Sequence, residues 1–489
     1  MDRLWQGDTG PPIGSSPDWP GPLPGRKLLG ERSDEGGLRH VRHTWPPDEG
    51  GLRHVRRTRP PARRARFRGR SRPGERDFRR LWAGDAVSQL GSQITLFALP
   101  YTAVSVLHAP GDQLGLLQAL YTLPFLLVPL PAGLWLDHRP LRGVLITVNI
   151  VCALLVLSVP LAAAAGTLRL AQLHLVAALG GAATVTSEIA MFALLPKLVT
   201  AERLASANSR LNAGLAVAVT SGPGIAVWLT TRFGAPDALL ADCLTYLFCA
   251  AALGRITHRQ RSRPIPRPGG RLRGELTAGL RVVLGYPPLR RIAVHAALFN
   301  ACAQAVNVAL VVHLVRDQRL GGLYGLVLVG GGLGGTAGTL LAPQLIRRLG
   351  HGRAALTAAA VAAPAFWLVP AAAGSRATVV ALCSAGLFAG SAGAGALSVV
   401  STTVRHLASP PALHARVSAA FRLVTFALVP VGALTGGLLV DGVGARATLW
   451  AAPAVMVAAL LPLLTLPVRT LHHVERQDHR AEPGLVAPG

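Results

Sequence analysis

The stretch "GLWLDHRPLRG" (residues 133–143) separates two long apolar runs, residues 114–136 and 144–161. A run of about 20 apolar residues is long enough to cross the roughly 30 Å hydrocarbon core of a bilayer as a helix. A short break that carries an acid, a histidine and two arginines is typical of a polar turn between two such helices. The stretch therefore predicts a helical hairpin in a membrane.

The same alternation continues outward from this turn. The chain has 489 residues, 51% of them hydrophobic, and a formal net charge of +26. We predict an all-α integral membrane protein with twelve transmembrane helices, because most of the apolar stretches are apolar on every face. The expected spans are 81–107, 114–136, 141–162, 169–195, 208–231, 236–254, 291–315, 321–346, 354–373, 377–401, 414–440 and 445–468.

Arginine and lysine are distributed unevenly between the expected loops. Counted from a cytoplasmic N-terminus, the inner loops carry 20 of these residues and the outer loops carry 6. Short cytoplasmic loops are enriched in positive charge. We therefore expect both termini in the cytoplasm, with the protein in the plasma or inner membrane of the cell.

The longest internal break divides the spans six and six. We expect five regions: a disordered basic cytoplasmic arm (1–77), an N-terminal six-helix half (78–254), a basic cytoplasmic linker (255–290), a C-terminal six-helix half (291–468) and a cytoplasmic tail (469–489). The arm contains a tandem 14-residue unit, "DEGGLRHVRHTWPP" and "DEGGLRHVRRTRPP". Two copies that end in proline pairs predict no packed core. The alternative is a polybasic arm that binds anionic lipid or nucleic acid.

Short echoes connect the two halves. "SANSRL" (206–211) recurs as "SAAFRL" (418–423), 212 residues later, each just before the fifth span of its half. Two glycines of the first half, Gly222 and Gly234, recur 210 residues later as Gly432 and Gly444. These offsets predict two six-helix pseudo-repeats, an architecture of secondary transporters.

Twelve spans, a basic central loop and the charged turn after the second span resemble the major facilitator superfamily over residues 78–468. In that family this turn reads glycine, three residues, aspartate, arginine and further basic residues. Gly133, Asp137 and Arg142 match this pattern, while His138 replaces the usual arginine and Arg139 follows it. The resemblance implies a conformational switch. The alternative is a turn whose charges only set topology, which would leave Asp137 without a role.

The candidate switch residues include the arginines of the two echoed segments as well as the charged turn. The full set is Gly133, Asp137, Arg139, Arg142, Arg210 and Arg422.

Three segments resemble the multidrug and siderophore exporter branch of that family. They are "RRLWAGDAVSQLGSQIT" (79–95), "ALLPKLVTAERLASANSRL" (193–211) and "GAPDALLADCLTYLFCA" (234–250). In addition, Gly222, Pro223 and Gly224 are similar to a glycine-proline motif associated with antiport in exporters. We interpret these three residues and Asp242 as helix-packing positions.

Polar side chains follow one face of the first and the seventh spans. In the first span, Gln89 and Gln93 follow Asp85 at i+4 and i+8. The seventh span carries Asn300, Gln304 and Asn307. The resemblance implies that the first, fourth, seventh and tenth spans line a central cavity, so these amides are candidate substrate contacts. Alternatively, they hold helices together.

Carboxylates within spans are candidate proton carriers, because ionisable groups are costly in a membrane and usually functional. Glu188, in the fourth span, is the first candidate and Asp85 is the second. The alternatives are a structural pairing of Glu188 with an arginine, and an Asp85 that is solvated or paired with Arg79 or Arg80. For Asp242 we favour a hydrogen bond between helices.

The chain has no nucleotide-binding motif and no nucleophile–base or metal-ligand constellation. We therefore predict a secondary active transporter, not an enzyme, with the proton gradient as its energy source and no cofactor or metal. The expected activity is export of an amphipathic small molecule (a drug, siderophore or secondary metabolite) by alternating access. We expect a monomer whose partners are this substrate, protons and the lipid bilayer, with no nucleic acid. The alternatives are uptake or uniport of a metabolite, and a non-transporting membrane scaffold with a polybasic arm.

Overall fold

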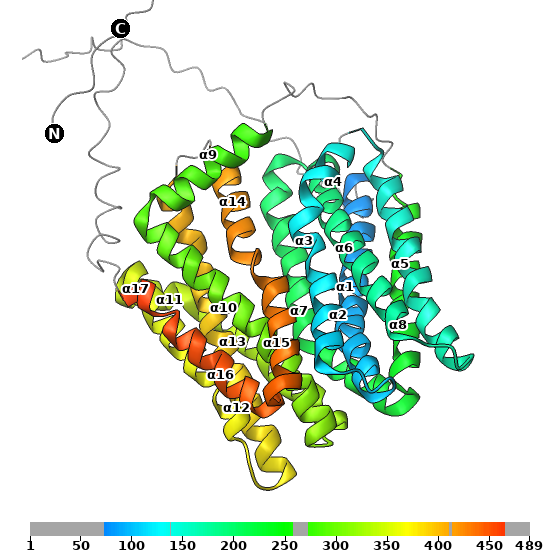
Figure 1. The fold of residues 1–489 in the computed structure, drawn as a ribbon. Coiled ribbons are helices and arrows are strands. Elements are labelled where there is room, and N and C mark those ends of the chain that lie inside the picture. Colours follow the sequence, from blue (N-terminus) through cyan, green and yellow to red (C-terminus); the bar gives the residue numbers. More distant parts are fainter. Residues whose placement is uncertain (1–72, 137, 258–271, 410–412, 465–489) are drawn as a thin grey trace, which may run out of the picture. The chain divides into compact units, whose positions relative to one another are not determined.

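A computed structural model describes residues 73–464 apart from 137, 258–271 and 410–412. The described residues belong to the second of two units into which the chain divides, Gly69–Gly489. They form helices and no strand (Figure 1). Within this described part, nine segments are long and apolar enough to cross a membrane. The expected all-α membrane fold is confirmed.

The first half of the described chain contains eight helices. They are α1 (Pro73–Ser105), α2 (Gly111–Thr122), α3 (Pro124–Leu127), α4 (Pro129–Leu136), α5 (Leu141–Ala164), α6 (Leu170–Leu198), α7 (Ala201–Phe233) and α8 (Ala235–Gly254). Three of them, α2 to α4, occupy the expected second span. This span is divided because Pro124 and Pro129 lack the backbone N–H that would continue a helix.

The second half begins within the expected linker and contains nine further α-helices. They are α9 (Leu272–Gly285), α10 (Pro287–Val311), α11 (Tyr324–Ala365), α12 (Leu368–Ala371), α13 (Arg376–Leu407), α14 (His414–Phe426), α15 (Val429–Val443), α16 (Ala445–Ala458) and α17 (Leu461–Leu464). A π-helical turn, η1 (Val312–Asp317), and a 3-10 turn, η2 (Gly321–Leu323), lie between α10 and α11.

The nine apolar segments do not map one to one onto the expected spans. One segment of 51 residues, Gly321–Ala371, covers both the eighth and the ninth. Within it Gly350 has φ 74° and ψ 167°, which interrupts α11. The expected first span is not among the nine segments because α1 carries polar residues, and the expected second span is not among them because it is divided into α2, α3 and α4. The number twelve stays a prediction.

The N-terminal boundary of the helical unit differs from the prediction. The disordered arm was expected to reach residue 77, but α1 begins at Pro73. A proline in the first turn is already fixed at a helical φ, and Glu75 in the same turn complements the helix dipole. Asp77 is only 2% exposed and accepts hydrogen bonds from the backbone N–H and the hydroxyl of Thr257. This contact anchors the first turn. The tandem repeat and the tail 469–489 lie outside the described residues.

Buried side chains form three clusters, of which one contains residues of both halves and two lie within one half each. One cluster contains residues of both halves, such as Phe97 of α1 and Tyr324 of α11, whose ring centroids are 5.2 Å apart. The other two belong to one half each: Leu141 and Leu253 lie in one, Leu289 and Val400 in the other. We call the end with the two separate clusters, where α8 ends and α9 begins, the linker end. The end with the shared cluster, where α2 begins and α15 ends, is the far end.

Small residues set the close packing of α11 against α13. A Cβ added at Gly334 would lie 2.0 Å from the carbonyl oxygen of Phe388, and one at Gly338 would lie 1.9 Å from that of Ala392. Small residues allow helix backbones to approach within a membrane. This pair of helices is therefore held together through backbone contact.

Candidate functional site

The second half contains a cavity of about 430 Å³ between α10, α13 and α14. Its walls combine the rings of Phe299, Phe421 and Phe426 with polar groups. The polar lining residues are Asn300, Ser398, Ser401, Arg405, Ser418, Arg422 and Thr425. The cavity is therefore amphipathic, and both charges on its described lining are positive.

An ion pair joins this cavity to the first half. Nη2 of Arg422, on α14, lies 3.2 Å from Oε2 of Glu188, on α6. The arginine side chain is 55% exposed and the glutamate side chain is 36% exposed. An exposed pair contributes only roughly 0–1 kcal/mol, so little free energy is needed to break it. The pairing of Glu188 with an arginine, which the sequence left open, is present in this state.

Asp85 lies near Glu188 but has different partners. Its carboxylate accepts a hydrogen bond from Gln89, one turn along α1, and interacts electrostatically with Glu188. Arg80, one of the two candidate partners for Asp85, instead contacts Asp77 at 3.2 Å. The two candidate proton carriers are therefore coupled to each other, and both are partly buried.

The amides of the seventh span form a path from the cavity toward the first half. Asn300 donates to the carbonyl oxygen of Thr425 at 3.1 Å. Nε2 of Gln304 lies 3.4 Å from Oε1 of Gln118 on α2, and Asn307 donates to Gln304 at the same distance. The described contact across the halves therefore runs to α2 rather than to the amides of α1.

Asp242 is fully buried between α8 and α1. Its carboxylate accepts hydrogen bonds from the hydroxyls of Thr95 on α1, at 2.5 Å, and Thr245 on α8, at 2.9 Å. Burial of a carboxylate is tolerable when it is hydrogen-bonded in this way. The bond from Thr95 joins the two helices within the first half, and the bond from Thr245 lies within α8.

The glycine-proline segment of α7 lies against helices of both halves. A Cβ at Gly222 would lie 2.4 Å from Cβ of Gln93 on α1, and one at Gly224 would lie 3.3 Å from Val329 on α11. The carbonyl of Pro223 faces Gly325 of α11, 2.7 Å from the position of an added Cβ. Larger residues at these points would separate the helices.

The charged turn after the second span is only partly described. Asp137 lies outside the described residues. Arg142 donates to the carbonyl oxygens of Leu253, at 2.9 Å, and Gly254, at the end of α8. Arg139 lies over the ring of Trp135, 5.6 Å from its centroid. In this state the arginines of the turn contact their own half.

The other switch candidates have few neighbours in this state. Apart from its chain neighbours and the backbone of its own helix, no described atom lies within 4 Å of a Cβ built on Gly133. Arg210 is exposed, and its carbonyl accepts a hydrogen bond from the indole of Trp82. Arg422 is the one candidate of this set whose described contacts include a carboxylate of the opposite half.

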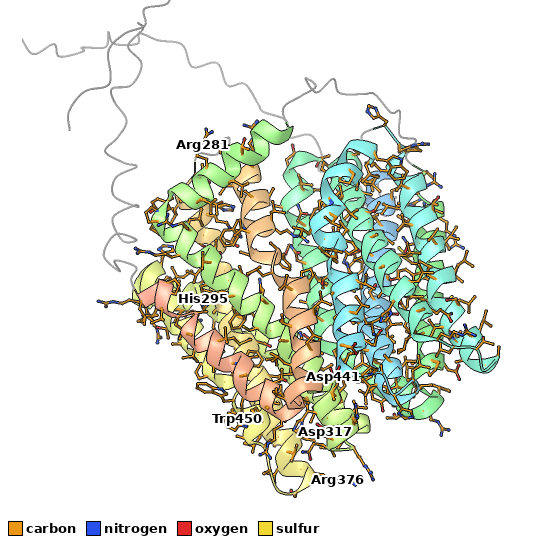
Figure 2. All side chains as sticks on the ribbon, in the orientation of Figure 1. Arg281, His295, Asp317, Arg376, Asp441 and Trp450 are labelled. Atoms are coloured by element: carbon orange, nitrogen blue, oxygen red, sulfur yellow. The ribbon has the colours of Figure 1, made fainter. Side chains whose placement is uncertain are left out.

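At the far end, α15 crosses α2 at close range. The carboxylate of Asp441, labelled on α15 in Figure 2, accepts hydrogen bonds of 2.7 Å from the backbone N–H groups of Gly111 and Asp112. The first N–H groups of a helix have no acceptor within the helix, so Asp441 caps α2 from the other half. A Cβ at Gly115 would lie 2.5 Å from the carbonyl oxygen of Ala433.

A second crossing joins α7 to α11 at the same end. Here Gly325 faces the carbonyl oxygen of Pro223. Each partner lies 210 residues from its counterpart in the first crossing, Gly115 and Ala433. The offset found in the sequence therefore relates real contacts, and the far end is closed by two equivalent crossings.

Several of these residues were not predicted. Ser398, Ser401 and Arg405 were missed although they recur at i, i+3 and i+7 on one face of α13, a pattern that could have been found. Nothing in the sequence marks Asp441 as the cap of a helix more than 300 residues away.

The profile of the transmembrane secretion effector family matches residues 74–487. The chain belongs to the major facilitator superfamily. An uncharacterized MFS-type transporter, y4rN of Sinorhizobium fredii, is 29% identical to this major facilitator over 251 residues, 50% of this chain and 60% of that relative. The chain thus spans less than two thirds of this relative's length.

Solved structures share the fold of this major facilitator. A mutant of the nucleoside transporter NupG is similar with a TM-score of 0.67 and 11% identity, over 79% of this chain and 99% of its own. A bacterial homologue of the iron transporter ferroportin in an inward-facing state has a TM-score of 0.60 and 19% identity, over 80% of this chain and 98% of its own. At such identities the similarity shows the fold alone.

Proposed function

We propose that this major facilitator exports an amphipathic small molecule from the cytoplasm in exchange for protons, by alternating access, and works as a monomer in the cell membrane. The direction is supported by the family's description as secretion effectors. The positive-inside bias supports a cytoplasmic linker end. Among the described residues, the cluster shared by the halves lies at the far end, so we infer a state that is open at the linker end, which the charge bias would place in the cytoplasm.

The observation that carries the proposal is the ion pair between Glu188 and Arg422. It joins the two halves on the open side, and Arg422 also lines the cavity. A proton on Glu188 removes the charge that holds Arg422, so protonation frees the arginine and loosens a contact between the halves. Asp85 is the second candidate carrier, since its carboxylate interacts with that of Glu188. Proton binding and rearrangement of the halves would thus be linked at one residue.

Inside-out membrane vesicles test this proposal. The probes are two permanently charged dyes with the same ring, 1-pyrenesulfonate and (1-pyrenylmethyl)trimethylammonium. We expect the vesicles to take up one of the two dyes. An imposed proton gradient should drive this uptake, and a protonophore should abolish it. Glu188→Gln should reduce this uptake at least about tenfold at equal protein abundance, because the amide keeps the shape but cannot gain or lose a proton.

The matched control is Glu202→Gln on α7, an exposed carboxylate away from the cavity, which should transport at the wild-type rate. Flux that persists without a gradient would instead indicate uniport. Normal gradient-driven uptake in both Glu188→Gln and Asp85→Asn would contradict the antiport mechanism.

A further inference from the structure

The cavity of the second half has a chemical bias that the export proposal does not use. Two arginines, Arg405 and Arg422, line the cavity, and none of the described lining residues carries a carboxylate. Arg422 is shared with Glu188, so its charge is partly balanced. Arg405 is the cation that belongs to the cavity alone.

The guanidinium of Arg405 is held in a fixed orientation. Its Nε donates to the carbonyl oxygen of Ser401 at 3.3 Å, and its Nη2 donates to the hydroxyl of Thr402 at 2.7 Å. Its Cζ lies 4.5 Å from the ring centroid of Phe421. These bonds use two of five N–H donors, which leaves a planar set of donors for a further acceptor. Such a planar fork suits the two oxygens of a carboxylate or related oxyanion.

A second group points to the same kind of ligand. Ser401 is one of the lining residues and is only 6% exposed, and its buried hydroxyl has no hydrogen-bond partner among the described residues. Buried hydroxyls nearly always have a hydrogen-bond partner, so the hydroxyl of Ser401 is available to donate to a ligand. Ser401 precedes Arg405 by one helical turn, so both lie on the same face of α13. An oxyanion held by Arg405 would offer the missing acceptor.

The rest of the cavity limits the ligand further. The rings of Phe299, Phe421 and Phe426 form an apolar wall beside the arginines. A volume of about 430 Å³ has room for a small organic molecule with a ring or chain. The ligand must therefore combine an oxyanion with an apolar body.

We propose that this cavity binds an amphipathic organic anion, whose carboxylate, sulfonate or similar oxyanion is held by Arg405 and the hydroxyl of Ser401. The inference rests on the proposed function, because it names the class of molecule that is exported. An anionic lipid headgroup carries the same chemistry, and the experiment separates it from a soluble anion.

The test measures binding to the purified full-length protein in phosphatidylcholine nanodiscs, where no gradient exists. The probes are 1-pyrenesulfonate, the trimethylammonium probe and neutral 1-pyrenemethanol, followed by fluorescence anisotropy. We expect the sulfonate to bind most tightly. Arg405→Gln should weaken its binding at least about tenfold, and Arg405→Lys less, because lysine keeps the charge but loses the planar fork. Ser401→Ala should weaken it by about two- to fivefold.

Two controls keep the result specific. Arg348→Gln removes an exposed arginine of α11 outside the cavity and should leave sulfonate binding unchanged. Binding of 1-pyrenemethanol should survive Arg405→Gln, which shows that the variant is folded and that the loss concerns charge. Equal affinity for all three probes, or an unchanged preference in Arg405→Gln, would overturn the proposal.

A third arm adds phosphatidylglycerol to the nanodiscs. The sulfonate should still bind when this lipid is present, and displacement by the lipid would show a lipid site and overturn the assignment to a soluble anion. Binding of the sulfonate without gradient-driven uptake would leave the anion site intact and refute export. Gradient-driven uptake without charge selection would leave the export proposal intact and refute the anion site.

Discussion

The two crossings at the far end repeat one backbone arrangement with different chemistry. In each, a glycine at the start of one helix faces a carbonyl oxygen of a helix from the other half: Gly115 faces Ala433, and Gly325 faces Pro223. In the α2/α15 crossing, Asp441 also caps α2. Its counterpart 210 residues earlier, Thr231, donates instead to Val227 of its own helix. The repeats have kept the close approach, while one of them alone has gained an electrostatic contact.

This difference indicates that the two crossings resist opening unequally. The start of α11 has no side-chain cap, so at this end its separation from α7 breaks van der Waals contacts, and the hydrogen bond between Thr220 and Thr336 lies farther along the two helices. Separation of α15 from α2 also removes an acceptor from two backbone N–H groups. In the proposed transport cycle, the α2/α15 crossing would therefore be the harder of the two to open.

The largest effect is expected when the shared arrangement itself is broken. Gly115→Val places a Cβ 2.5 Å from a backbone oxygen that cannot rotate away. Overpacking of this kind costs about 1–3 kcal/mol or more, so thermal unfolding of the purified protein should shift clearly downward. Gradient-driven dye uptake should also be lost.

Gly325→Val is the same change in the other repeat and should give a shift of similar size. Gly442→Val is the control and should behave as wild type, because no described atom of another element lies within 4 Å of the Cβ that it adds to α15. A stable, active Gly115→Val protein would show that the close approach is not needed.

A smaller effect should distinguish the two crossings. Asp441→Ala removes the cap of α2 and should cost about 0.5–2 kcal/mol, which opens the far end more often. Thr231→Ala removes a bond within one helix and should change the free energy of unfolding by less than about 0.5 kcal/mol. The measurement is the labelling rate of a cysteine at Gln118, between the halves, by an impermeant maleimide in a background without native cysteines. Equal labelling in the two variants would remove the proposed asymmetry.

The smallest effect is expected outside both crossings. Deletion of residues 2–72 keeps Arg76, Arg79 and Arg80, so topology should hold. Maleimide labelling at Gln118 and dye uptake should match the full-length protein, because the arm's composition predicts no core and no specific site. Correct insertion with lost transport would assign a function to the arm.

The apolar runs were sufficient to predict the fold, because a bilayer leaves helices as the main way to satisfy the backbone. The offset between the halves also followed from sequence, and it reappears in the contacts of Gly115 and Gly325. The start of α1 did not follow, because it depends on Asp77 meeting Thr257 far along the chain.

The candidate site was less predictable than the fold. Glu188 and Arg422 were both chosen from sequence, but as a proton carrier and a switch residue, not as a pair. Their contact depends on how the halves meet, which no local pattern encodes. Arg405 was counted only among the 20 basic residues of the expected inner loops, which set topology. The expected site roles of these residues stay predictions.

The packing of α11 on α13 has a genetic consequence. Every missense mutation at a glycine codon adds at least a Cβ atom to the Cα. At Gly334 and Gly338 that carbon would fall about 2 Å from a carbonyl oxygen of α13, where neither helix has a side chain that can turn aside. In a library of all single-codon variants, these two positions should accept only synonymous changes. Substitutions should be accepted more readily at exposed residues of the same helices, such as Leu340 and Phe388.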